Sequence, residues 1–179
     1  MATLATTNVK HASSSSNNIV LHTDGTTHIP GHIVQVVQAT TDTEVSTNST
    51  TPSDTGLTVS ITPTSSNSKI LVLVSQAYRA RHTAGPSVGG DIRLVRGSNV
   101  LVFGPGDYGI WHQNGTGNVD IFDRVNYQYL DSPSYTLGDS ITYKTTAVSY
   151  NSAHYIWTQP AANATSKGNS YITVMEVAA

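Results

Sequence analysis

The sequence predicts an all-β protein: an antiparallel β-sandwich of jelly-roll type, preceded by an extended N-terminal arm. Apolar and polar residues alternate with a period of two along many short segments, which is the pattern of half-buried strands. Thr, Val, Ile and nine Tyr are abundant, and these residues favour strands. Clusters of Gly, Pro, Asn and Ser separate the segments, and no segment has the pattern of an amphipathic helix.

Residues 1–31 form the predicted arm, and residues 32–179 the sandwich domain. Within the arm, Ile19–His22 and Thr26–Ile29 flank an Asp-Gly turn, which predicts a short hairpin. Two strands alone are marginal in water, so the arm needs a partner: its own domain, a second copy or another protein. The apolar residues expected to dock the arm or to join copies are Val9, Ile19, Leu21 and Ile29.

The sandwich domain is predicted to contain nine or ten strands. Leu57, Val59 and Ile61 alternate with hydroxyl residues, whereas Ile70–Val74 is apolar on both faces and is predicted to lie deepest in its sheet. The remaining strands are expected at residues 33–38, 91–96, 99–103, 108–112, 121–130, 140–150, 154–157 and 170–177. Eight to ten short strands in this length are typical of a jelly roll. The glycines, including Gly89–Gly90, are expected in turns.

Charge and composition exclude several classes of function. The formal net charge is −2 without any cluster of like charge, so we expect no nucleic-acid binding. The longest purely apolar run, Ile70–Val74, is far shorter than the roughly 20 residues of a membrane helix, so we expect no membrane insertion. The start of the chain lacks a basic segment followed by an apolar one, so no secretory signal is expected. The absence of Cys excludes thiolate metal sites and cysteine nucleophiles.

No motif of an enzyme or of a cofactor site is present, so we expect neither catalysis nor a cofactor. Asp120 and Asp123 are three residues apart in a predicted strand, so they point to opposite faces and cannot form a local acid pair. His22, His28 and His32 leave one metal hypothesis open, because three copies of one His around a threefold axis could complete a site.

Aromatic and cationic side chains give the most distinctive surface chemistry. Tyr, Trp and Arg anchor interfaces because they bury large areas at a modest cost in entropy. Three places are open for such residues in this chain: the core, a subunit interface, or a contact with a sugar or receptor. The candidates are Tyr78, Arg79, Arg81, Trp111, His112, Tyr127, Tyr129 and Trp157.

Several segments, in order, resemble a family of virion proteins of marine tailed bacteriophages. The similarity covers residues 33–179, and Ser13–Leu21 of the arm is similar to the repetitive β segments of phage fibre shafts. The resemblance implies a structural or adhesive virion component that is usually trimeric, and it supplies no catalytic or ligand residues. The matching segments are Gln35–Thr41, Asp54–Pro63, Ser68–Val72, Arg93–Gly97, Leu130–Pro133, Thr142–Lys144 and Ile172–Val177.

We therefore expect a short homotrimeric fibre or appendage on the virion exterior, assembled in the host cytoplasm. Its arm would dock on capsid or tail proteins, and its sandwich would attach to a host glycan or receptor. The alternative is a protein that decorates and cements the capsid exterior. A polysaccharide-degrading tail spike is a further alternative, and a secreted carbohydrate-binding module is disfavoured by the expected lack of a signal.

Overall fold

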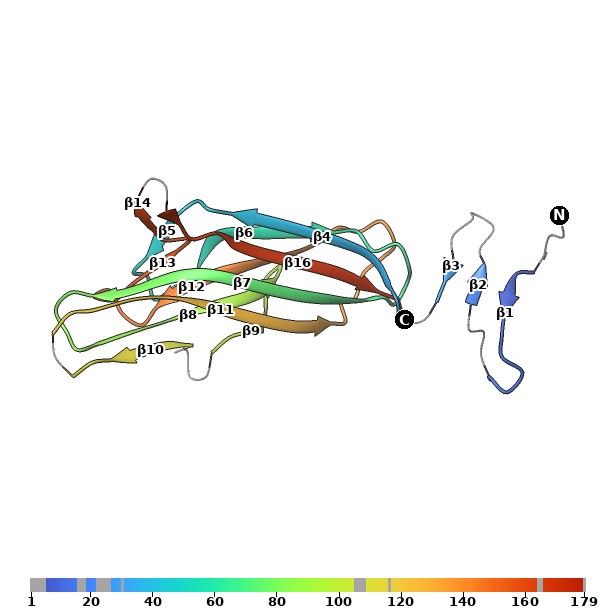
Figure 1. Ribbon diagram of the computed structural model, residues 1–179, viewed down its shortest axis with the longest axis horizontal. Helices are drawn as coiled ribbons and strands as arrows, with labels where there is room; N and C mark the ends of the chain where they lie inside the picture. Colours follow the sequence, from blue (N-terminus) through green and yellow to red (C-terminus); the bar gives the residue numbers. More distant parts are fainter. Residues whose placement is uncertain are drawn as a thin grey trace.

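The molecule is a two-layer antiparallel β-sandwich with two small additional sheets, one of two strands and one of three strands, the latter beyond one end of the sandwich (Figure 1). The computed structural model describes residues 6–15, 19–21, 27–29, 31–104, 109–115, 117–163 and 166–178. Over these ranges the secondary structure is entirely β, and no helix capable of crossing a membrane is found. The predicted all-β fold is confirmed.

The described part of the chain contains sixteen strands. They are β1 (Asn8–Val9), β2 (Ile19–Leu21), β3 (Thr27–His28), β4 (Ile33–Thr41), β5 (Val45–Thr47), β6 (Ser53–Ile61), β7 (Lys69–His82), β8 (Ser87–Arg96), β9 (Asn99–Val102), β10 (Ile110–Gln113), β11 (Val119–Asp131), β12 (Ile141–Ser149), β13 (Tyr155–Thr158), β14 (Ala161–Asn163), β15 (Ser166–Lys167) and β16 (Ser170–Val177).

Strand β7 organises the six-stranded sheet, whose order is β4-β16-β7-β13-β5 with β11 on the other side of β7. Along one edge β7 pairs first with β16 and then with β13, and along its other edge it pairs with the whole of β11. The prediction that Ile70–Val74 lies deepest in its sheet is confirmed by this central position. The two faces of the Ile70–Val74 segment differ, however: Ile70, Val72 and Val74 are buried, whereas Leu71 and Leu73 are only half-buried.

The five-stranded sheet has the order β10-β8-β12-β6, with β9 beside β8. Strands β4, β7, β11 and β16 lie in one sheet, and β6, β8, β10 and β12 lie in the other. Successive members of this set change sheet, except that β8 and β10 lie in the same one. The resulting orders, β4-β16-β7-β11 and β6-β12-β8-β10, are those of a jelly roll. Two clusters of buried side chains fill the space between the sheets, one around Leu57, Val72 and Tyr143 and the other around Ile92 and Ile156.

The three arm strands form a sheet of their own, β1-β2-β3. The predicted hairpin is found, because Val20 pairs with His28 and Leu21 with Thr27, while its turn lies outside the described residues. Strand β1 was not predicted and pairs with β2 through Val9 and Ile19. Figure 1 places this sheet beyond the end of the sandwich at which the C-terminus lies.

Glycines 89 and 90 do not lie in a turn, which corrects the sequence-based expectation. They lie within β8, where a β-carbon would collide with neighbouring groups. At Gly89 it would come within 2.5 Å of the Trp111 ring, and at Gly90 within 2.7 Å of the Ile156 side chain. The two glycines therefore allow close packing on the two faces of the strand.

Two buried carboxylates anchor the sandwich. Asp131 of β11 accepts hydrogen bonds from Arg96 of β8 at 2.6 Å and from the Tyr143 hydroxyl of β12 at 2.7 Å, so it joins the two sheets. Burial, followed by this bond to Asp131, raises the pKa of Tyr143. Glu176 of β16 accepts hydrogen bonds from the Thr64 amide and from Gln35. Burial alone would raise the pKa of Glu176, but these and neighbouring hydrogen bonds hold it below its ordinary value.

We expect Asp131→Ala to lower the free energy of unfolding by about 3 kcal/mol, because it leaves Arg96 and the Tyr143 hydroxyl without their shared partner. Asp54→Ala is the matched control, since Asp54 pairs with Lys144 on the surface and such pairs contribute at most about 1 kcal/mol. Urea unfolding measures the free energy of unfolding of both variants. Equal losses would show that Asp131 is no more important than a surface carboxylate.

A buried imidazole makes stability depend on pH. His154 is 3% exposed, its Nδ1 accepts a hydrogen bond from the Gly89 amide at 3.0 Å, and its ring lies 4.5 Å from that of His82. Burial and then the neighbouring His82 lower the pKa of His154. Folding therefore favours the neutral ring. Its contribution to stability is complete above the ordinary histidine pKa of about 6.5 and is lost as the pH falls towards the lowered value.

We expect the urea midpoint of unfolding to be lower at pH 5 than at pH 7.5. The reason is that protonating the buried His154 ring lowers the free energy of unfolding. His154→Asn retains an acceptor near the Gly89 amide and cannot titrate, so it should flatten this dependence. The exposed His112→Asn serves as the control and should keep it. A wild-type slope in His154→Asn would assign the effect to other groups.

Candidate functional site: the outer face of the six-stranded sheet

The outer face of the six-stranded sheet carries a group of interacting aromatic and cationic side chains. Alternation along β7 directs Ile70, Val72 and Val74 into the core and the odd-numbered residues away from it. The pairing registers then align outward residues of adjacent strands in rows. One such row is Phe122 of β11, Arg79 of β7 and Trp157 of β13.

This row forms a ladder of stacked planar groups, which we call the aromatic ladder and define as Phe122, Arg79, Trp157 and Tyr155. The Arg79 guanidinium lies 5.1 Å from the centre of the Phe122 ring and 5.0 Å from that of Trp157. The rings of Trp157 and Tyr155 are stacked at 5.4 Å. Phe122 is 56% exposed and Tyr155 40% exposed, so both ends of the ladder reach solvent.

Asp120 holds the ladder in place. Its carboxylate accepts two hydrogen bonds from Arg79, at 2.7 Å from Nε and 2.6 Å from Nη2, and Arg81 lies 3.8 Å away. The two hydrogen bonds from Arg79 lower the pKa of Asp120, and the same contact raises that of Arg79. A bidentate pair fixes the plane of a guanidinium, which here sets the stacking between the two rings.

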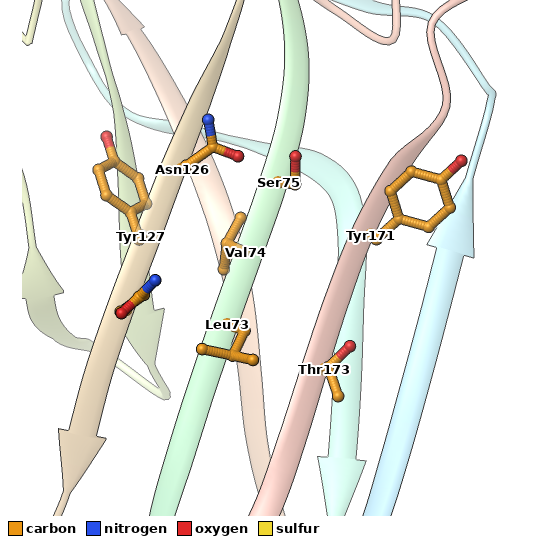
Figure 2. A pocket seen from close by; sticks show the side chains of 8 residues that line it. Leu73, Val74, Ser75, Asn126, Tyr127, Tyr171 and Thr173 are labelled. Carbon is orange, nitrogen blue, oxygen red and sulfur yellow. The ribbon is translucent and has the colours of Figure 1, made fainter.

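A shallow trough with a volume of about 240 Å³ lies on the same face, across β11, β7 and β16. Figure 2 shows Asn126, Ser75 and Tyr171 at one level across the three strands, with Leu73 and Thr173 at the next level. Gln128 pairs opposite Leu73 and completes the second level. All six side chains are uncharged.

The predicted surface residues separate into three groups. Arg79, Arg81 and Trp157 come together on this face. Tyr78, Tyr127 and Tyr129 instead point between the sheets, where Tyr78 is 7% exposed and the Tyr127 hydroxyl donates to the carbonyl of Ile92. Tyr78 is a core residue, whereas Tyr127 and Tyr129 are half-buried and pack against the core. Burial raises the pKa of Tyr78 and Tyr127. The remaining two, Trp111 and His112, lie on β10 of the other sheet.

Sequence reasoning missed most of the residues that complete this face. Strand parity could have identified Asp120, which faces the same side as Phe122. The pairing partners could not be read from the chain, because they are set by contacts between strands distant in sequence. The residues missed are Phe122, Asp120, Arg124, Asn126, Gln128 and Tyr171.

Within the described ranges, no cluster of three His, Asp or Glu side chains could hold a metal ion. The threefold histidine hypothesis concerns copies of the chain and stays a prediction. His22 lies outside the described residues, and Nδ1 of His32 interacts with the carbonyl of Ile29.

We expect Arg79→Lys to weaken the ladder, because lysine keeps the charge but cannot form the bidentate pair or stack as a plane. The loss should be about 1 kcal/mol in free energy of unfolding, and the emission of Trp157 should shift to longer wavelength in a Trp111→Phe background. Arg81→Lys is the matched control, since the contact that Arg81 makes with Asp120, at 3.8 Å, is longer than the two hydrogen bonds from Arg79. An unchanged Trp157 spectrum in Arg79→Lys would contradict the stacking.

Comparisons with known proteins identify no family for this chain. No protein-family profile and no curated protein matches the sequence. Among solved structures, a chain in the structure of infectious bursal disease virus, Gt strain, is similar over 95% of this chain, with 12% sequence identity and a TM-score of 0.27. This chain spans half the length of that viral chain. At this TM-score the similarity carries no argument about function.

Proposed function

We propose that the chain is a structural protein of a tailed-phage virion, of the type found in marine phages. The arm docks on capsid or tail proteins, and the jelly roll projects from the virion exterior as a short trimeric fibre for attachment to the host. The resemblance of residues 33–179 to that family and the jelly-roll fold support the proposal. We propose assembly in the host cytoplasm, without contact to nucleic acid or insertion into a membrane.

The observation that carries this proposal is the exposed apolar surface of the arm sheet. Val9, Leu21 and Ile29 are 42%, 38% and 41% exposed, and Ile19 is half-buried. Strands of two or three residues cannot enclose these side chains by themselves. Burial in an assembly contributes up to about 2 kcal/mol for each such side chain, which favours docking or self-association of the arm.

The second candidate within this proposal is a capsid-decorating cement protein, which the same exposed arm would also suit. The hairpin of the arm, similar to fibre-shaft segments, favours the fibre.

The carboxylates support a non-enzymatic role over a polysaccharide-degrading tail spike. The carboxylate of each Asp or Glu that the structure describes accepts a hydrogen bond from another group of the protein. A glycosidase instead needs two carboxyl groups that face a common substrate. The nine described residues are Asp42, Glu44, Asp54, Asp91, Asp120, Asp123, Asp131, Asp139 and Glu176.

The oligomer test uses the full chain. Light scattering should give about three times the monomer mass of 19.0 kDa, and Leu21→Asp with Ile29→Asp should lower it, since each change places a charge in a shared apolar contact. Val100→Asp, at a similarly exposed residue of β9, is the control and should leave the mass unchanged. A monomeric wild-type protein at micromolar concentration would refute the trimer.

Location on the particle decides between the two candidate roles. Antibody labelling of intact virions should mark the tail or its appendages if the chain is a fibre, and the capsid faces if it cements the shell. A cement role also predicts that shells without the protein lose resistance to heat. Virions without any label would contradict a place on the exterior.

A further inference from the structure

The geometry points to the trough on the outer face as a binding site for neutral oligosaccharides, with Tyr171, Asn126 and Gln128 as the principal contacts. This inference deepens the proposed function, because it names the chemical class of ligand through which the projecting domain would attach. It concerns only the jelly roll, so it is tested separately from the location of the protein on a particle.

The trough matches the two chemical faces of a pyranose ring. A neutral sugar has a rim of hydroxyl groups and a face of C–H bonds, so its site needs amide or hydroxyl partners together with an aromatic ring. Tyr171, 39% exposed, supplies the ring, and Leu73 supplies apolar surface beside it. Ser75 and Thr173 supply hydroxyl groups.

Two amides remain available for a ligand. Among the described residues, the structure shows no hydrogen bond from the Asn126 or Gln128 side chain to another protein group. Each amide offers two donors and one acceptor oxygen, and a pair of sugar hydroxyls can satisfy both kinds of group. Both residues lie on β11 and are two apart, so their side chains point to the same side.

Arg124 holds one wall of the trough rigid. Its Nε donates to the Ser75 hydroxyl at 3.1 Å, and its Nη2 donates to the carbonyls of Ser75 and Asn169 at 3.2 and 2.8 Å. The guanidinium lies 5.8 Å from the centre of the Tyr171 ring. These contacts orient the ring before a ligand arrives, which lowers the entropy lost on binding. They also commit the cation to protein oxygens, which favours a neutral ligand over an acidic one.

The aromatic ladder lies farther along β7 on the same face of the sheet as the trough, whose lining ends at Ser75. Ser75 and Arg79 are four residues apart, which corresponds to about 13 Å in an extended strand. An oligosaccharide seated on Tyr171 can therefore run along the strand towards Phe122 and Trp157. A trough of this size encloses about one ring, so we expect a dissociation constant of about 1 mM for a single chain. Several copies on one particle would raise the avidity.

The experiment titrates the full-length ¹⁵N-labelled protein with hexaoses of glucose, galactose and mannose, up to about 10 mM. Hexagalacturonate is the acidic comparison. We expect at least one neutral hexaose to shift amide signals of β7, β11 and β16 around the trough. Tyr171→Ala and Asn126→Ala should each weaken that binding by about tenfold, whereas Tyr171→Phe retains the ring and most of the affinity. Phe103→Ala, an exposed aromatic residue beside β9, should have no effect.

Three results would overturn the inference: no response to any neutral hexaose, a response to hexagalacturonate alone, or unchanged binding in both Tyr171→Ala and Asn126→Ala with native spectra. None of these bears on virion labelling or oligomer mass, so a failure here is separable from a failure of the proposed virion role. Conversely, a protein that binds hexaose but does not label virions would support this inference and refute that role.

Discussion

The continuous pairing of β7 is the constraint on which the rest of the structure depends. This strand is the common neighbour of β11, β16 and β13, and the three meet in one sheet only through it. A slip of one residue in any of these pairings would turn every side chain of that strand to the opposite face. The aromatic ladder would then lose a member, and the trough would lose one of its walls. The outer face is therefore a product of strand register.

Buried polar contacts make that register hard to change. Asp131 spans the two sheets, and Glu176 ties the last strand to the loop that carries Thr64. A carboxylate buried without partners costs several kcal/mol, so any displacement of β11 or β16 along its neighbours carries that cost. Apolar packing alone would tolerate small displacements, because Val, Ile and Leu fit many alternative neighbours. The charged contacts thus add specificity to a core that apolar residues stabilise.

Alternation and turn residues predicted the jelly-roll class and ten of the thirteen strands from β4 to β16, because both are local properties of the chain. The same alternation distinguishes outward Arg79 and Arg81 from inward Tyr78, but only once each strand is oriented relative to the core. Strand pairing joins residues far apart in sequence, such as Phe122 with Arg79 and Trp157 with Arg79, so neither the ladder nor the trough was predictable. Strands β1, β5, β14 and β15 were missed because two or three residues carry too little pattern.

The hydrogen bonds between Gly31 and Ala178 and between Ala178 and His32 bring the junction of the arm to the end of the last strand. The point where the chain enters the jelly roll and the point where it leaves are therefore neighbours at one pole (Figure 1). The turn at residues 83–86, between β7 and β8, lies at the opposite pole. A peptide fused after the last strand would sit beside the arm and close to whatever the arm docks on. A foreign epitope inserted in the 83–86 turn would instead be presented at the pole opposite the arm, which makes that turn a suitable place for surface display.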